Sequence, residues 1–314
     1  MHGRLIKRTL RAAPFIFVAA LAPLLCACAA MTRPAGAGTP GASEGRKFAT
    51  LEASDERRKA ALANWREITG QPAATTTATT TATTAPTPEL QPVTATLKTL
   101  PANLQTQPRM PLVTINDKAA RKNNSDKAAK NTDEETRESL RRFMSSAAPL
   151  VGVELSELSL VEIVDAPDGA KTARYVQNSF PYPLRSGYGD VAVTFTPDLR
   201  VTMLSSTAIP DAESLRRSLA AVTQTVAADK ATASLANSTV TYTDNAGNRQ
   251  TRAITQSDAL TSRALVLFPV RRDGDPQTLE LHVAWEIAVG SPASPLLVYV
   301  DAATGQQIGA SQGT

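Results

Sequence analysis

Apolar residues recur at helical spacing in three stretches of this 314-residue chain. In the first, Leu51–Thr69, the apolar side chains fall on one helical face. The second begins at Thr132 with Thr-Asp-Glu-Glu, a capping-box pattern, and ends at Gly152. The third follows the predicted N-cap Asp211, and its apolar residues continue to Val226 at spacings of three and four. These patterns predict three amphipathic helices.

Apolar and β-branched residues alternate with polar ones after the second and third helices, which is the period of a strand. Turn sequences rich in Pro, Asp, Asn and Gly separate the segments and predict hairpins. The predicted strands are Leu158–Val164, Lys171–Phe180, Asp190–Thr196, Arg200–Ser206, Val240–Thr243, Arg249–Ile254, Ala264–Arg271, Thr278–Val289, Leu296–Asp301 and Gln306–Ile308. Helix, strands, helix, strands predicts an α+β fold with antiparallel sheets. We expect two helix-plus-sheet subdomains, residues 132–209 and 210–314.

The chain before residue 132 has the composition of a tether. Residues 28–50 are rich in small residues, and residues 70–131 hold a Thr/Ala/Pro tract followed by prolines and mixed charges. The tract Ala73–Pro88 cannot bury enough apolar surface to offset the entropy of ordering, so we expect disorder there and a flexible tether before the 51–69 helix. The prolines up to Ile115 predict an extended chain, and Asp117–Asn131 a solvated stretch. That helix either docks a partner or packs on the main domain.

The first 27 residues have the layout of an export signal. Four bases precede the apolar run Ala12–Ala27, which is shorter than a membrane-spanning helix. The run ends in Leu25-Cys26-Ala27-Cys28, which resembles the bacterial lipobox. The resemblance implies cleavage between Ala27 and Cys28 and a lipid anchor with palmitate-type chains on Cys28. We expect a bacterial envelope protein held at the outer or cytoplasmic membrane; an ordinary secretory signal and an uncleaved anchor are the alternatives.

Charge and cysteine content narrow the class of protein further. The chain has 33 bases and 29 acids, a formal charge of +4. Removing the four bases of the export signal from 33 leaves 29, so the processed chain is neutral and does not favour a nucleic-acid partner. Both cysteines, Cys26 and Cys28, lie near this signal. The folded part therefore has no disulfide and depends on its apolar core.

The sequence offers few residues for catalysis. Its histidines are His2, inside the export signal, and His282. A zinc protease needs two histidines one helical turn apart, and a Cys/His zinc centre needs more ligands than remain, so we expect no metal, no cofactor and no enzyme activity. In the strand Thr278–Val289, Glu280, His282 and Glu286 share a face. They form either a carboxylate–imidazole site, which could serve an enzyme, or a polar face open to solvent.

Two stretches also resemble a known family. Arg137–Phe195, which includes Tyr175-Val176-Gln177, resembles the fungalysin/thermolysin propeptide (FTP) domain. Leu281–Ile308, with its Ala-Trp-Glu strand and the turn sequence Val298–Gly305, resembles the end of a PepSY module. The chain departs from the family at Pro197-Asp198-Leu199, where the family has an Asp-Gly hairpin.

The resemblance implies non-catalytic work, because such propeptides inhibit a thermolysin-type zinc metalloprotease and assist its folding. No peptidase sequence follows within this chain, so we expect a separate exported protease as the partner. The expected contact is a polar, flexible tail that enters the protease cleft: Ile308, Gly309, Ala310, Ser311, Gln312, Gly313 and Thr314. The alternative is a structural or assembly module of the cell envelope with no protease partner.

Overall fold

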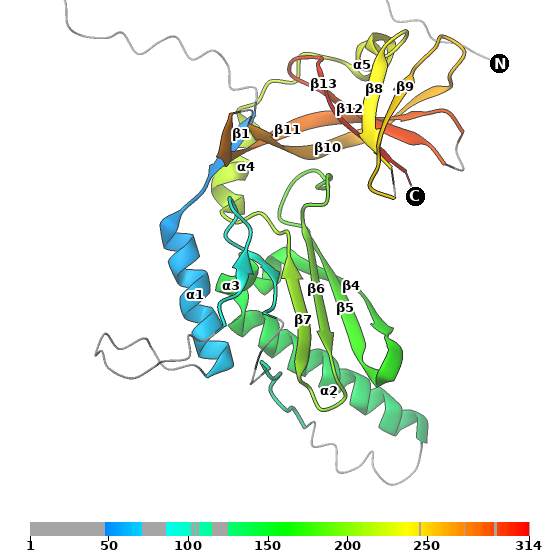
Figure 1. Ribbon diagram of the computed structural model, residues 1–314. Helices are drawn as coiled ribbons and strands as arrows, with labels where there is room; N and C mark the ends of the chain where they lie inside the picture. The colour runs from blue at the N-terminus through cyan, green and yellow to red at the C-terminus, as the bar shows by residue number, and fades with distance from the viewer. Residues whose placement is uncertain are drawn as a thin grey trace, which may run out of the picture. The chain divides into compact units, whose positions relative to one another are not determined.

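The computed structural model describes residues 48–70, 86–101, 104, 107–114, 125–244, 246–272, 274–291 and 294–313. Helices and mainly antiparallel sheets alternate along these residues, which confirms the predicted α+β class (Figure 1). The strands form a seven-stranded sheet, a four-stranded sheet and a two-stranded hairpin. The predicted export signal and most of the first predicted tether lie outside the described residues.

The seven-stranded sheet has the order β1-β11-β12-β13-β8-β9, and β10 pairs with the other edge of β11. Its strands are β1 (Ala49–Glu52), β8 (Thr239–Thr243), β9 (Arg249–Ala253), β10 (Leu260–Arg272), β11 (Asp275–Val289), β12 (Leu296–Asp301) and β13 (Gln307–Gln312). All contacts are antiparallel except the one between β13 and β8. Because β10 occupies one edge of β11, β1 and β12 follow each other along its other edge.

Two short helices, α4 (Ala212–Ala220) and α5 (Ala228–Ser234), pack on one face of this sheet. Leu215 and Leu219 of α4 share a core with Leu279 and Leu281 of β11, as the strand alternation predicts. The predicted third helix is wrong in its length, because α4 ends before the apolar pattern does. The chain turns there, and α5 contributes a separate set of core contacts.

The four-stranded sheet is an antiparallel meander in chain order. Its strands are β4 (Leu158–Asp165), β5 (Lys171–Gln177), β6 (Asp190–Phe195) and β7 (Val201–Ser206), close to the predicted bounds. One face packs against helices α2 (Ser125–Ser146) and α3 (Ala148–Val151) in a core that contains Leu140, Phe143 and Tyr175. Short 3-10 turns, η2 (Leu155–Glu157) and η3 (Pro167–Gly169), flank β4.

The turn between β6 and β7 carries a non-glycine residue in a left-handed conformation. Leu199 has a φ of 64°, in the left-handed region that glycine adopts freely. A leucine pays about 1 kcal/mol for this conformation. The predicted hairpin is therefore confirmed, although its turn carries a residue poorly suited to it.

Helix α1 (Asp55–Thr69) begins later than the predicted start at Leu51. Leu51 belongs to β1, where it pairs with Leu279, and Ser54 caps α1 by accepting from the Arg57 N–H. The apolar spacing misled the prediction because a buried strand residue happened to extend the helical pattern. The strand that pairs with Leu51 lies more than two hundred residues later in the chain.

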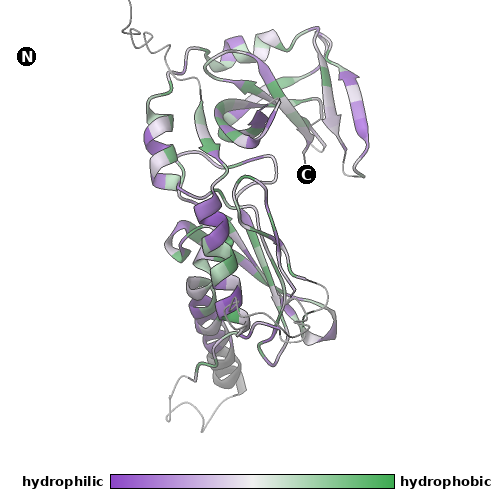
Figure 2. Cartoon of the chain, turned by 60° about the vertical axis from the view of Figure 1, so that its left-hand side comes forward, coloured by the Kyte–Doolittle hydropathy of each residue, from purple (hydrophilic) through white to green (hydrophobic). Residues whose placement is uncertain are grey.

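Trp65 shows where α1 belongs. Its indole is buried in the core of the four-stranded sheet, and its Nε1–H donates to the Pro86 carbonyl at 3.2 Å. Asn64 adds a hydrogen bond to the Ser146 carbonyl at the end of α2. The interpretation in which this helix packs on the main domain is therefore confirmed. Figure 2 shows hydrophobic and hydrophilic residues on different parts of the helix surfaces, as amphipathic packing requires.

Parts of the predicted linker 70–131 are ordered elements. Strands β2 (Glu89–Leu90) and β3 (Leu97–Thr99) form a hairpin, and Leu97 and Met110 are buried in the core of the four-stranded sheet. The prediction gave weight to the prolines, yet extended proline-containing segments can still bury apolar side chains against a sheet edge. The predicted linker thus contributes to the folded core at these residues.

Helix α2 also begins at Ser125, within that linker, and runs past Thr132. The capping box predicted at Thr132 is therefore wrong as a helix start. A capping pattern marks a helix start only where the preceding residues leave the helix, and here they continue it. The predicted boundary between residues 209 and 210 stays a prediction. Two elements that precede both predicted subdomains also belong to the cores: β1 packs in the core of the seven-stranded sheet, and α1 packs in the core of the four-stranded sheet.

Candidate functional site

The second face of the seven-stranded sheet buries the polar side chains of β11. His282 is only 8% exposed and Glu286 only 4%. The interpretation of this face as solvated is therefore wrong. The geometry agrees with the alternative in which carboxylate and imidazole meet, because His282 Nε2 lies 3.3 Å from Glu280 Oε2.

Aromatic rings from neighbouring segments cover this charged cluster. The rings of Phe268 on β10 and Tyr299 on β12 lie 4.4 Å apart between centroids, and the ring of Phe48 lies 4.8 Å from that of His282. Gly309 on β13 leaves the space that Phe268 fills, since a Cβ there would lie 2.3 Å from the Phe268 ring. The sheet therefore closes over its own polar residues.

Asp301, which the sequence did not mark as a site residue, completes the cluster. Its Oδ2 lies 2.5 Å from His282 Nδ1, and its Oδ1 accepts from the N–H groups of Ala303 and Thr304. Burial raises the pKa of Asp301, but these hydrogen bonds outweigh it and hold the pKa below its ordinary value. The only sequence signal was an aspartate opening the turn Asp-Ala-Ala-Thr-Gly.

Two arginines neutralise the glutamates of β11. Arg272 Nε lies 2.6 Å from Glu280, and Arg185 Nε lies 2.6 Å from Glu286. Arg185 comes from the segment between β5 and β6, so its ion pair joins the two sheets. The hydrogen bond to Glu286 raises the pKa of Arg185 above its ordinary value.

The segment that carries Arg185 is held at the edge of β10 by its backbone. Leu267 N–H donates to the Pro183 carbonyl, and Arg185 N–H donates to the Leu267 carbonyl. Farther along, the Gln177 side chain accepts from Ile209 N–H and donates to the Ile209 carbonyl, both at 2.9 Å. The glutamine of the Tyr-Val-Gln sequence thus fixes the connection that leads to the second sheet.

The cluster's chemistry is that of a structural ion network. Both ring nitrogens of His282 face a carboxylate, so neither is left to accept a proton from a serine hydroxyl, as a nucleophilic triad requires. Among the residues that the structure describes, no group of His, Cys, Asp and Glu has the arrangement of a metal site. The carboxylates of this cluster pair with its cations.

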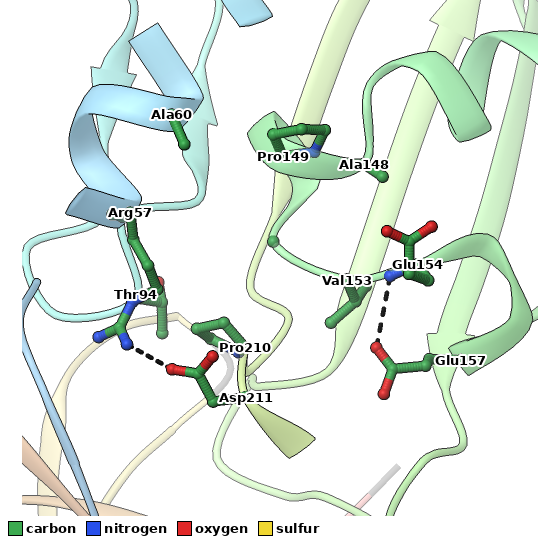
Figure 3. Close-up of a pocket in the computed structure, with 12 residues that line it drawn as sticks. Arg57, Ala60, Thr94, Ala148, Pro149, Val153, Glu154, Glu157, Pro210 and Asp211 are labelled. Carbon is green, nitrogen blue, oxygen red and sulfur yellow. Dashed lines mark hydrogen bonds and ion pairs between the residues drawn. The ribbon is translucent and has the colours of Figure 1, made fainter. Parts of the chain in front are cut away.

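A pocket of about 250 Å³ lies between α1, α3, the turn before β3 and the start of α4 (Figure 3). Arg57 and Asp211 point toward one another across it at 2.5 Å, and Glu157 accepts from the backbone N–H of Glu154. Arg57 also contacts the carbonyls of Glu52 and Val93. Arg57 therefore links β1, α1 and the start of α4.

Asp211 does not act as the predicted side-chain N-cap. It precedes α4 with a φ of 58°, and its side chain makes no capping hydrogen bond. The carboxylate turns to Arg57 instead, because an arginine offers a charge-assisted bond that a backbone N–H does not match. This correction concerns the cap alone, since the helix starts where it was predicted.

The four-stranded sheet exposes apolar side chains on its outer face and free edge. Six large hydrophobic residues are exposed within the described part of the chain, and five of them lie on this sheet. These five are Leu160, Val161, Val164, Val176 and Met203. Sequence reasoning missed this surface, because strand alternation alone does not show which face a helix covers.

The predicted partner-binding tail is part of the seven-stranded sheet. Residues Gln307–Gln312 form β13, which pairs antiparallel with β12 and contacts β8 on its other side. The Ser311 hydroxyl also lies 3.1 Å from the Tyr299 hydroxyl. The expectation of a flexible tail from Ile308 is therefore wrong for 308–313, and Thr314 lies outside the described residues.

The predicted lipidation and cleavage positions, Cys28 and Ala27, lie outside the described residues. No helix within the part of the chain that the structure describes is long and apolar enough to cross a membrane.

Comparisons with known proteins add little to this geometry. No protein-family model matches the chain, and no curated protein sequence matches it. One solved structure with some likeness is the Bacillus megaterium YpeB C-terminal domain, at 12% sequence identity and a TM-score of 0.26. The alignment covers 84% of this chain and 99% of that one. A TM-score this low does not establish a shared fold, so the function must be inferred from the chain's own residues.

Proposed function

We propose that the chain is a non-catalytic, lipid-anchored protein of the bacterial cell envelope that binds a separate exported thermolysin-type zinc metalloprotease. Binding would inhibit the protease or assist its folding. The class of partner comes from the resemblance of residues 137–195 and 281–308 to protease propeptides. The anchor comes from the lipobox-like sequence that ends at Cys28.

The observation that supports a binding function is the outer face of the four-stranded sheet, where Val164, Val176 and Met203 are exposed among polar side chains. Val176 and Met203 are exposed on strands whose opposite face is packed on α2 and α3. Five of the six large hydrophobic residues exposed in the described part of the chain lie on this one sheet, and a gathering of this kind marks contact sites for partners. We therefore place the proposed interface on this face and not on the predicted tail, whose residues Gln307–Gln312 form β13.

The buried cluster around His282 supports the non-catalytic part of the proposal. A general base must reach a substrate proton, whereas His282 is covered and has a carboxylate at each ring nitrogen. The network is better suited to holding β11, β12 and the Arg185 segment together. This rigidity would present the outer surface of the neighbouring sheet in one arrangement.

The test combines capture with inhibition. The tagged full chain is used to capture proteins from the host's envelope and secreted fractions, and any captured zinc metalloprotease is assayed against it. The Val176→Lys/Met203→Lys variant places two charges on the proposed interface, so it should inhibit at least tenfold more weakly. Thr241→Lys/Thr261→Lys, which adds the same charges to exposed positions of the other sheet, should inhibit like the unaltered chain.

Two results would contradict the proposal. One is capture of envelope proteins alone, with no protease, which would favour the assembly-module alternative. The other is equal inhibition by both lysine variants, which would remove the outer face from the mechanism.

A further inference from the structure

The edge strands of the two sheets differ in how they are covered, and among the described residues the edge of β4 is left open. The outer edge of β7 is covered by hydrogen bonds from Val201 to Pro108 and from Met110 to Leu199, and β10 is covered by the Arg185 segment. The edge strand β9 has no such cover, but its sequence, Arg-Gln-Thr-Arg-Ala, is mostly hydrophilic (Figure 2). Polar and charged residues of this kind discourage pairing with another strand.

Strand β4 has no covering segment among the residues that the structure describes, and its charged residues are two acids, Glu162 and Asp165. It pairs with β5 alone and lies at the open side of its sheet (Figure 1). Its sequence, Leu-Ser-Leu-Val-Glu-Ile-Val-Asp, contains no lysine, arginine or proline. Leu160, Val161 and Val164 are 37%, 56% and 50% exposed. A long apolar edge strand is the feature to which other chains add strands.

The backbone of β4 also offers unpaired hydrogen-bonding groups. Gln177 N–H donates to Gly189 of the next strand, and Asn178 N–H donates to Glu157 on the β4 side. Backbone groups alternate in an antiparallel ladder, so the residues that pair with Tyr175 and Ala173 point away from β5. Those residues are Leu160 and Ile163, separated by the bulge at Val161.

The charge along this edge indicates what kind of strand fits. Glu157, Glu162 and Asp165 lie on or beside β4, and Asp190 lies on β6. In the described part of the chain only two bases are near them, Lys171 and Arg174, which pair with Asp165, Glu162 and Asp190, so four acids against two bases leave a net charge of −2. An incoming strand with basic side chains would meet excess negative charge. A second copy of β4 would bring Glu162 and Asp165 against the same acids, so the charges oppose self-pairing.

We propose that β4 is a strand-addition site that accepts an extended segment of a partner protein in which apolar and basic residues alternate. The segment's backbone would pair with Leu160 and Ile163, and its basic side chains would face the acids of this edge. This inference rests on the proposed binding function and names the chemistry of the partner's contact.

The test uses three synthetic peptides with the full chain. In the first, valine alternates with lysine; in the second, glutamate replaces lysine; the third is the lysine peptide with N-methylated backbone amides on one edge. The valine–lysine peptide should slow amide hydrogen exchange at Leu160 and Ile163 at least tenfold. The other two should bind at least tenfold more weakly, because one has the wrong charge and the other lacks ladder donors.

Matched variants locate the contact. Val161→Lys places a positive charge on the edge and should weaken the valine–lysine peptide at least tenfold. Leu112→Lys makes the same change at an exposed apolar residue that lies outside this sheet, and should leave peptide binding unchanged. Equal effects of the two variants would overturn the proposal.

Three other results would overturn it as well. They are equal binding of the charged and N-methylated peptides, no protection of Leu160 and Ile163 at millimolar peptide, and self-association that Val161→Lys abolishes. If these occur while the Val176→Lys/Met203→Lys variant still loses protease inhibition, the strand-addition site fails and the proposed function stands. If protease binding is absent altogether, the proposed function fails independently of the peptide result.

Discussion

Asp301 Oδ2 lies 2.5 Å from His282 Nδ1, and this contact joins the last residue of β12 to the middle of β11. Both side chains are buried beside the gap along β11 where β1 ends and β12 takes over. A paired imidazole and carboxylate at this point join β11 to β12. Several measurable consequences depend on that pairing.

Replacing His282 by Ala should destabilise the fold by about 3–5 kcal/mol, because it leaves the Asp301 carboxylate buried without its partner. Urea unfolding of the two proteins measures the difference in the free energy of unfolding. His282→Asn should recover part of the loss, since its amide can donate toward Asp301. Lys98→Met, which breaks an exposed ion pair with Glu89, should cost no more than about 1 kcal/mol. A His282→Ala cost equal to that of this control would contradict the role assigned to the pair.

The Asp301 contact should also shape the pH dependence of stability. Its folded pKa lies below its ordinary value despite burial, so the unfolded chain binds the proton more readily. The contribution is therefore complete above the unfolded pKa and is lost as pH falls through the folded pKa. Unfolding free energies between about pH 5 and about pH 2 should fall less steeply in Asp301→Asn than in the unaltered chain. Parallel curves would show that Asp301 titrates alike in both states.

Arg185→Met should open the contact between the β5–β6 segment and β10. Glu286 would be left buried and unpaired, a change that costs about 3–5 kcal/mol in comparable ion pairs. Amide exchange at Leu267, whose N–H donates to Pro183, should accelerate strongly. Adding Glu286→Gln should restore most of the protection, because it removes the buried charge. Arg200→Met, at an exposed pair with Asp198, supplies the control and should leave Leu267 unchanged.

Gln177→Ala should weaken the link to Ile209. The substitution leaves the Ile209 N–H and carbonyl without the side-chain amide that satisfies both, and each buried unsatisfied group costs about 1–3 kcal/mol. Thermal and urea unfolding measure the loss. Gln177→Glu keeps an acceptor for Ile209 N–H but buries a carboxylate against the Ile209 carbonyl, so at neutral pH it should be no more stable than Gln177→Ala. Stability of Gln177→Ala equal to that of the unaltered chain would show that water replaces the amide without penalty.

The lipid anchor predicted from the sequence can be tested at two neighbouring cysteines. Cys28→Ser should abolish incorporation of labelled palmitate and shift the protein from the membrane to the soluble fraction of lysed cells. Cys26→Ser should change neither result, because the lipobox-like sequence places the acylated residue at Cys28. Labelling that persists in Cys28→Ser would contradict the assignment.

Local patterns sufficed for most of the fold. The strands of the meander and the hairpin at Pro197 followed from alternation and turn residues, which act within a few positions of one another. The errors arose where a distant partner decided the outcome. Leu51 became a strand residue because β11 pairs with it, and 308–312 became a strand because β12 and β8 flank it. Neither pairing leaves a mark in the nearby sequence.

For the candidate site too, local spacing was informative and distant contacts could not be predicted. Glu280, His282 and Glu286 could be placed on one face from their spacing of two and four. Their burial could not, because Phe48, Asp301 and Arg185 reach them from three other segments of the chain. A period-two pattern shows which side chains share a face of a strand. It does not show whether that face is open to water or covered by a segment that is far away in the sequence.

Strand β1 determines which part of the molecule would open first under a pulling force. It holds only four residues, all paired to β11, and Phe48 immediately before it lies against His282. Tension on the chain ahead of Phe48 would thus load this short strand before it reached the longer helix α1 with its buried Trp65. Pulling would peel β1 first and admit water to the imidazole while the core of the other sheet remained closed. The seven-stranded sheet would therefore open at β1 before the core of the four-stranded sheet is disturbed.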